Sequence, residues 1–238
     1  MSYYSRRYAP RRKQRGTRRR IPVERSVAYI NILDRLYPHC IHDDSTIRQQ
    51  IETDYANHKI TYGEMQYEGL EQLYQHIIKF DNNSYPFVPH CFLDIGSGRG
   101  KLCLYMAAKS CIGQSIGIEL VKQRYEDALT LKNALDAKYP DYTKKVSFIN
   151  SNILDISLKQ YIRSAPVFVW FSNLCFDQSI TDKIFEKLIA ELPIGSIICC
   201  SKIPQIMNNG VENCKSLGQI SIPMSWAEDS IVFIYQNA

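Results

Sequence analysis

The sequence of 238 residues predicts an α/β fold, in which helices cover both faces of a mostly parallel sheet. Two observations support this fold class. From residue 91 onward, short apolar runs of strand length alternate with segments that have the spacing of amphipathic helices. Hydrophobic residues make up 45% of the chain, which is enough to bury the core of one main domain.

The first 20 residues differ in composition from the rest of the chain. They contain nine basic residues and no acidic one, so they cannot bury an apolar face and we expect a disordered tail. The basic residues are Arg6, Arg7, Arg11, Arg12, Lys13, Arg15, Arg18, Arg19 and Arg20. The other 20 of the 29 Lys/Arg residues stand against 24 Asp/Glu residues, so the chain beyond the tail is net negative. The cluster of bases is typical of a segment that binds phosphates.

A small helical segment is predicted over residues 21–60. One helix runs from Pro22 to Tyr37, because proline favours the first turn of a helix and apolar residues follow at helical spacing. A second helix follows the capping candidates Asp44 and Ser45.

The main domain is predicted over residues 61–238, and it begins with a helix over Tyr67–Phe80. The strands that follow are Cys91–Ile95, Ser115–Glu119, Val146–Asn150, Val167–Ser172 and Ser196–Cys200. The helices between or after them are Leu102–Lys109, Val121–Lys138, Ser157–Arg163 and Ser179–Leu192. Two last strands, Leu217–Ile222 and Ser230–Tyr235, are too close in sequence for a helical crossover, so they predict an antiparallel hairpin at the edge of the sheet.

A glycine-rich turn follows the first strand directly. Gly96, Gly98 and Gly100 have GxGxG spacing, which lets a ligand lie against bare backbone before the next helix. Asp94 precedes this turn, and its carboxylate would repel a pyrophosphate but can bind the ammonium group of S-adenosylmethionine (SAM). The turn therefore favours SAM over a nicotinamide cofactor.

Polar residues also stand at the ends of the next three strands. Glu119 ends the second strand, where an acid can accept hydrogen bonds from both ribose hydroxyls. Asn152 and Ile153 follow the third strand and suit an adenine edge and ring, and residues 172–176 follow the fourth. Because open α/β sheets bind ligands at the carboxyl ends of their strands, this order predicts a Rossmann-like, seven-stranded fold of the SAM-dependent methyltransferases.

Several motifs can be compared with known families. They are Tyr62-Gly63-Glu64, Asp94-Ile95-Gly96-Ser97-Gly98-x-Gly100, Gly117-Ile118-Glu119, Ser172-Asn173-Leu174-Cys175-Phe176, Cys200-Ser201-Lys202 and Ser225-Trp226. Many methyltransferases share the glycine turn, whereas the Tyr-Gly-Glu loop, the Asn-x-x-Phe of residues 173–176, the Ser-Lys and the late Ser-Trp are more particular. In these motifs, over about residues 55–236, the chain resembles the non-SET histone lysine methyltransferases of the disruptor-of-telomeric-silencing type. The resemblance suggests a minimal or viral member of that family.

The resemblance implies roles for individual residues. Cofactor contacts are implied for Tyr62, Gly63, Glu64, Asp94, Gly96, Ser97, Gly98, Gly100, Lys101, Leu102, Glu119, Asn152 and Ile153. A narrow channel for the substrate lysine is implied between Phe176, Trp226 and Phe233. Asn173 would lie beside the transferable methyl group, and it is assigned to the catalytic site with Tyr62 and Phe233. No residue stands out as a dedicated base.

The chain departs from the family pattern at five of these or neighbouring positions. The family usually has an acid at Asn152, an aromatic residue at Ile153, a small polar residue at Met65, a glutamine at Lys101 and a tyrosine at Phe233. The amide of Asn152 can still accept a hydrogen bond from the adenine amino group.

The resemblance implies a SAM-dependent histone-lysine N-methyltransferase that acts on a core lysine of histone three in the nucleosome. We expect a monomer that works in the nucleus or a viral factory, with its basic tail on nucleosomal DNA or on the acidic histone face. No apolar run approaches the roughly 18 residues of a membrane span, and no complete set of metal ligands is evident.

Two other interpretations remain open. Residues 172–176 could be a degenerate Asn-Pro-Pro-aromatic motif of a nucleic-acid amino-methyltransferase, although both prolines are absent. The chain could also be a chromatin-binding module with a vestigial SAM pocket, which the retained Asp94, Gly96 and Glu119 argue against.

Overall fold

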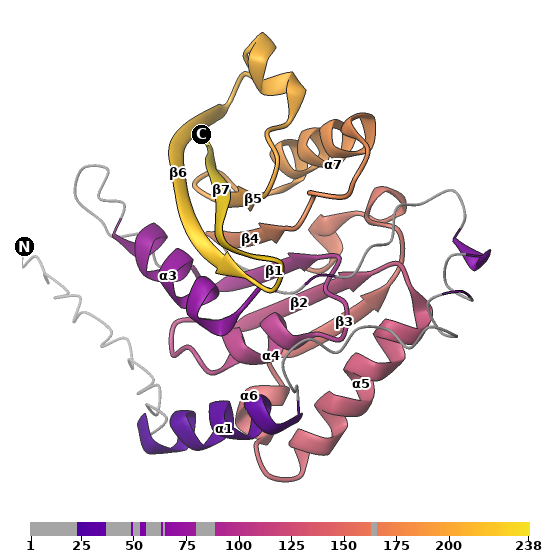
Figure 1. Cartoon of the computed structure of the whole chain (residues 1–238), viewed down its shortest axis with the longest axis vertical. Coiled ribbons are helices and arrows are strands. Elements are labelled where there is room, and N and C mark those ends of the chain that lie inside the picture. The colour runs from indigo at the N-terminus through magenta and orange to yellow at the C-terminus, as the bar shows by residue number, and fades with distance from the viewer. Residues whose placement is uncertain are drawn as a thin grey trace, which may run out of the picture.

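The computed structural model of the chain describes residues 23–36, 49, 53–55, 63, 65–79, 89–162 and 166–238 (Figure 1). Several predictions lie outside these residues. They concern the basic tail over residues 1–20, most of the helix after Ser45, and the side chains of Tyr62 and Glu64. No helix in the described ranges is long and apolar enough to cross a membrane.

A seven-stranded sheet forms the centre of the molecule, with the order β3-β2-β1-β4-β5-β7-β6 (Figure 1). The strands are β1 (Cys91–Ile95), β2 (Gln114–Glu119), β3 (Val146–Asn150), β4 (Val167–Phe171), β5 (Ile197–Cys200), β6 (Cys214–Met224) and β7 (Ala227–Asn237). The first five are parallel, whereas β7 is antiparallel to both of its neighbours, β5 and β6. This topology confirms the predicted Rossmann-like sheet and its antiparallel edge hairpin.

Two hydrophobic clusters cover the two faces of the sheet. Neighbouring strand residues alternate between them, because side chains along a strand point to opposite faces. Cys199 belongs to one cluster and Cys200 to the other, and Phe168 and Val169 divide in the same way. All four side chains are completely buried. Strands β4 and β5 are therefore apolar on both faces, as expected for strands buried between helices.

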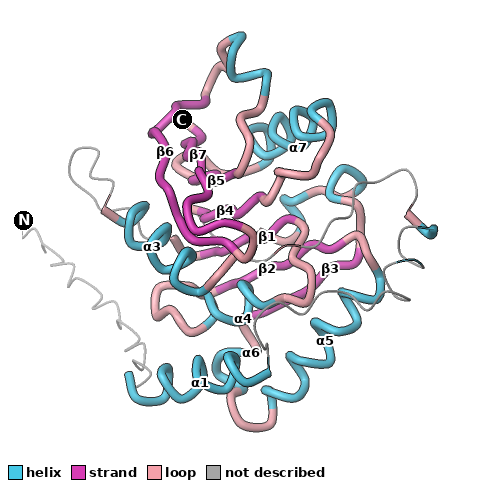
Figure 2. Tube along the Cα trace, in the orientation of Figure 1, coloured by secondary structure: helices cyan, strands magenta, loops and turns pink. Residues whose placement is uncertain are grey.

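Helices lie on both sides of the strands, as Figure 2 shows in cyan and magenta. The helices are α1 (Val23–Leu36), α3 (Tyr67–Ile78), α4 (Lys101–Ala107), α5 (Lys122–Asp136), α6 (Pro140–Thr143) and α7 (Gln178–Glu191). Residues of α1, α3, α4, α5 and α6 contribute to one cluster, and α7 packs on the other. In α1, the ring of Tyr29 packs on Tyr139 and Tyr142, and its hydroxyl donates to the carbonyl of Leu104 at 3.1 Å. This helix is thus part of the same core.

The predicted helix over Ser157–Arg163 is wrong. In the described part of this range, residues 157–162, the structure has a short 3-10 turn, Leu158–Gln160, in place of a helix. The backbone N–H of Leu158 donates to the carboxylate of Glu191, at the end of α7, at 2.6 Å. A seven-residue segment gains little from helix formation, so this tertiary hydrogen bond decides its conformation.

The edge hairpin is longer than predicted. Each of its strands has 11 residues, because the ladder continues through exposed polar positions that carry no hydrophobic pattern. The register shifts between Ser216 and Gly218 and again between Ile222 and Met224. Such irregularities increase the local twist. In Figure 1 the hairpin curves beside α3, which packs on β6.

Candidate cofactor and substrate site

A cavity of about 340 Å³ opens at the carboxyl ends of β1, β2, β3 and β4. The chain order reverses between β1 and β4, so the loops after these strands separate and leave a crevice. Its lining includes the segments 94–98, 118–120, 151–154 and 172, 174–177, which are the four strand ends singled out in the sequence. The structure therefore brings these four separate signals together.

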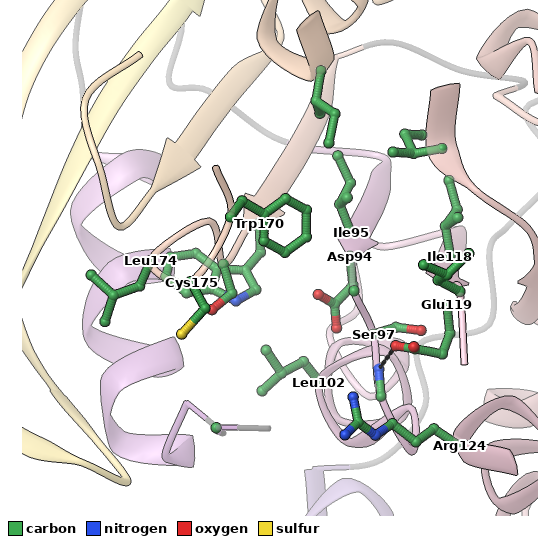
Figure 3. Close-up of a pocket in the computed structure, with 18 of the residues that line it drawn as sticks. Asp94, Ile95, Ser97, Leu102, Ile118, Glu119, Arg124, Trp170, Leu174 and Cys175 are labelled. Carbon is green, nitrogen blue, oxygen red and sulfur yellow. Dashed lines mark hydrogen bonds between the residues drawn. The ribbon is translucent and has the colours of Figure 1, made fainter. Parts of the chain in front are cut away.

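The glycine turn holds its shape through Glu119. Gly96 and Gly98 have φ angles of 76° and 54°, values that favour glycine. One carboxylate oxygen of Glu119 accepts a hydrogen bond from the N–H of Gly98 at 2.7 Å (Figure 3), and the other accepts from the N–H of Val121 at 2.8 Å. A carboxylate oxygen can accept more than one hydrogen bond. Glu119 thus orients the turn and also faces the cavity.

Asp94 is a buried carboxyl group with its side chain in the cavity (Figure 3). Only 2% of the residue is exposed. Burial, and secondarily the charge of Glu119, raises the pKa of Asp94 from 3.8 to about 8. A carboxyl group in this state gains from a nearby cation, because the cation favours its ionised form. The ammonium group of SAM meets this need.

Ser97 supplies a second feature that fits a cofactor. Its hydroxyl is buried, lines the cavity, and has no hydrogen-bond partner among the described residues. Buried hydroxyl groups are costly unless they are hydrogen-bonded. A ligand with polar groups beside the glycine turn would satisfy it. The polar groups of Asp94, Ser97 and Glu119 therefore fit an amino-acid nucleoside such as SAM.

Among the described residues, two basic side chains line the cavity. Lys101 begins α4 and is 8% exposed, and its ammonium lies 4.7 Å from the ring centroid of Tyr67. Arg124 lies in the first turn of α5 and is 6% exposed, on the same side of the cavity as Glu119 in Figure 3. These two side chains partly balance the charge of the acids.

The third strand end places Asn152 and Ile153 in the cavity wall. The side-chain carbonyl of Asn152 accepts the N–H of Leu154 at 3.0 Å, which caps a short 3-10 turn. Ile153 is 6% exposed and belongs to the hydrophobic cluster on the α7 face. The amide N–H₂ group of Asn152 and the second lone pair of its oxygen are available to a flat heterocycle.

Part of the cavity lining is apolar. It is formed by Leu174, Phe176, Ile180 and Trp226, of which Leu174 is 48% and Trp226 40% exposed. Large exposed apolar side chains at the mouth of a cavity are typical of a binding surface. Phe176 packs edge to face on Phe171, with ring centroids 5.4 Å apart, which fixes its position.

Three of the predicted site residues that the structure describes are not in the cavity wall. Asn173 is completely buried, and its side chain bonds the backbone of Lys202. Phe233 lies in β7, next to Cys200 of β5, and packs against the hydrophobic cluster on the α7 face of the sheet. Gly100 is also absent from the lining, where the ring of Phe148 occupies the space of a Cβ atom, 2.2 Å away. The cofactor and catalytic roles of these residues remain predictions.

Several cavity residues were missed in the sequence. They are Leu120, Arg124, Leu154, Trp170, Asp177, Ile180 and Ile184. Leu120, Leu154 and Asp177 adjoin the segments that follow the strands, so strand ends were the usable signal for these three. Trp170 is different, because it lies within β4, where it is the register partner of Asp94. Only the pairing of β1 with β4 brings these two side chains to one wall (Figure 3).

Comparison with solved structures shows the fold. The protein yhhF of Escherichia coli is 14% identical, covers 75% of this chain and 89% of its own, and has a TM-score of 0.51. An uncharacterised protein of Listeria monocytogenes is 14% identical, covers 73% and 68%, and has a TM-score of 0.50. Both are similar to this chain in architecture alone.

Comparison of sequences is more specific. A histone-lysine N-methyltransferase of Caenorhabditis elegans, named as specific for lysine 79 of histone H3, is 28% identical over 114 residues. This alignment covers 47% of the chain but only 12% of that relative. The profile of the family described as histone methylation protein DOT1 matches residues 37–225, more than half of the chain. The protein therefore belongs to the DOT1 histone methylation family.

Proposed function

We propose that the protein transfers a methyl group from SAM to the side chain of a core lysine of histone three in the nucleosome. The observation that carries the proposal is a single cavity with a polar cofactor end and an apolar mouth. Asp94 and Glu119 mark the first end, and Phe176 and Trp226 mark the second. Membership of a histone methylation family supports the choice of substrate.

The residues at the polar end would each hold a different part of SAM. Asp94 would bind the ammonium group, and Lys101 would bind the carboxylate of the same amino-acid moiety. Glu119 would accept hydrogen bonds from the ribose hydroxyls, while Asn152 and Ile153 would contact the adenine. Further contacts to SAM would come from Tyr62, Gly63, Glu64, Gly96, Ser97, Gly98, Gly100 and Leu102.

The apolar end would prepare the lysine. When bound, SAM supplies an electrophilic methyl group on a sulfonium, and the protein has to present a neutral amine in line with it. Phe176, Trp226 and Phe233 would exclude water from the amine and lower its pKa, because a desolvated site disfavours the charged form. Asn173 would position the loop that faces the methyl group, and alignment of the reactants supplies much of the rate.

The nucleosome would be bound through the basic tail. The nine bases of residues 1–20 are separated in sequence from a net negative remainder, so the tail is the natural contact to DNA phosphates or to the acidic histone face. Action on a nucleosome places the protein in the nucleus.

A methylation assay with four substrates tests the proposal. Nucleosomes, free histones, DNA and RNA are offered in parallel with radiolabelled SAM, and the expected product is methylated histone three, preferentially from nucleosomes. Methylation of DNA or RNA instead would favour a nucleic-acid amino-methyltransferase. SAM binding is measured separately by calorimetry, and a folded protein that does not bind SAM would be a chromatin-binding module.

A further inference from the structure

The segment that precedes α3 is in close contact with the turn of the edge hairpin. Met65 forms an isolated antiparallel bridge with Met224, and the side-chain amide of Gln66 donates to the carbonyl of Met224 at 3.3 Å. Gly63 and Met65 line the cavity from this segment, and Trp226 lines it from the hairpin turn. Two parts of the chain far apart in sequence thus form one wall.

Gly63 lies directly against the indole of Trp226. A Cβ atom at this position would be 2.6 Å from Cζ3 and 2.7 Å from Cε3 of the indole, whereas ordinary contact begins at 3.4 Å. The indole therefore has its present position only because residue 63 has no side chain. The obstructing atoms are at the end of a side chain that is 40% exposed, so the indole can move aside without unfolding the chain.

Gly69 provides a useful contrast. A Cβ atom there would be 2.3 Å from the backbone carbonyl oxygen of Pro223. A backbone atom in the hairpin cannot move independently of its strand. A methyl group at residue 69 would therefore disturb the packing of α3 on β6, whereas one at residue 63 would displace a single side chain.

We propose that Gly63 is a positioning residue, which sets the place of the Trp226 indole and thereby the shape of the substrate entrance. This inference rests on the proposed function, in which Trp226 lines the path of the lysine. Gly63 would then affect substrate specificity as well as contact the cofactor, because it acts on the substrate through the position of the indole. If residue 63 had a Cβ atom, the indole would have to move until its Cζ3 lay at least 3.4 Å from that atom instead of 2.6 Å. Such a movement is large for a wall that aligns a reacting amine.

A double-mutant cycle with Gly63→Ala and Trp226→Ala tests this. We expect Gly63→Ala to lower kcat/KM on nucleosomes by at least about tenfold, since misplacements near 1 Å cost up to about a hundredfold. The double variant should match Trp226→Ala in kcat/KM within about twofold, because the alanine no longer meets an indole. Additive losses, or unchanged kcat/KM in Gly63→Ala, would overturn the proposal.

A second measurement separates this inference from the proposed function. Trp170 is 2% exposed and should be poorly quenched by acrylamide, so quenching of the fluorescence reports on Trp226. Quenching should change in Gly63→Ala, and unchanged quenching would show that Gly63 does not position the indole. If the wild-type protein methylated no histone, the proposed function would fail while this measurement would still decide the contact. Gly69→Ala serves as the control and should lower the Tm more than Gly63→Ala.

Discussion

The side chain of Asn173 binds the backbone of Lys202 with both ends of its amide. The N–H of Lys202 donates to Oδ1, and Nδ2 donates to the carbonyl of Lys202, each at 2.8 Å. Asn173 follows β4 and Lys202 follows β5, so this pair of hydrogen bonds joins the loops at two strand ends. It fixes the start of the loop that carries Leu174 and Phe176 into the cavity.

Asn173→Ala should reduce both stability and turnover. Two backbone groups of Lys202 would lose their partners, which costs about 1 to 3 kcal/mol for each buried group, and the loop would lose its anchor. We expect kcat to fall by about tenfold or more, with a smaller effect on SAM affinity. Thermal unfolding and single-turnover kinetics check this. Wild-type turnover in a folded Asn173→Ala protein would remove the proposed role.

Glu119→Ala should weaken SAM binding by at least about tenfold, because the ribose hydroxyls lose a charge-assisted acceptor worth about 1.5 to 3 kcal/mol. The N–H groups of Gly98 and Val121 would lose their acceptor as well, so the glycine turn would loosen. Calorimetry gives the affinity. Glu119→Gln keeps one acceptor oxygen and should lose less, and equal affinity in Glu119→Ala and the wild type would contradict the assignment.

Stability should depend on pH through Asp94. Its pKa is raised from 3.8 to about 8, so between these values the folded protein binds one more proton than the unfolded chain. The free energy of unfolding should therefore fall as pH rises from about 4 to about 8. Thermal unfolding across this range, compared with Asp94→Asn, isolates the contribution. In addition, binding of S-adenosylhomocysteine at neutral pH should release a proton in the wild type and none in Asp94→Asn.

Lys101→Met should weaken binding of S-adenosylhomocysteine by about tenfold, because a charge-assisted contact to the carboxylate is lost. 5′-Methylthioadenosine is a matched control, since it lacks the amino-acid moiety, and its affinity should not change. Equal losses for both ligands would mean that Lys101 acts through the cavity as a whole, for example through its contact with the ring of Tyr67.

Removal of residues 1–20 should abolish most of the nucleosome affinity and leave SAM binding intact. About six phosphate contacts predict a slope near −5 for log affinity against log salt, which the truncation would flatten. A shallower slope and competition by acidic-patch ligands would identify the histone face. Lys122→Gln with Lys144→Gln is the control, since these side chains are 72% and 67% exposed outside the tail. A truncated enzyme with full activity on nucleosomes would show that the tail serves another purpose.

The local pattern of the sequence was sufficient for the strands and for the residues at their ends. The limits of β1 and β3 agree with the prediction, and Asp94, Glu119, Asn152 and Ile153 all line one cavity. These features depend on short-range alternation of apolar residues and on the rule that parallel strands carry ligands at their carboxyl ends. Each of these features can be recognised from the sequence of one strand and the loop that follows it.

Other features of the site were decided by contacts between distant parts of the chain. Trp170 reaches the cavity because β4 pairs with β1, and Arg124 is buried because α5 packs beside Glu119. The same holds for the bonds between Asn173 and Lys202, for the contact of Gly63 with Trp226, and for the turn at Leu158. The periodicity of the sequence shows which face of a helix or strand is apolar. The positions of these side chains depend instead on which neighbouring element covers that face. Only the packed structure contains that information.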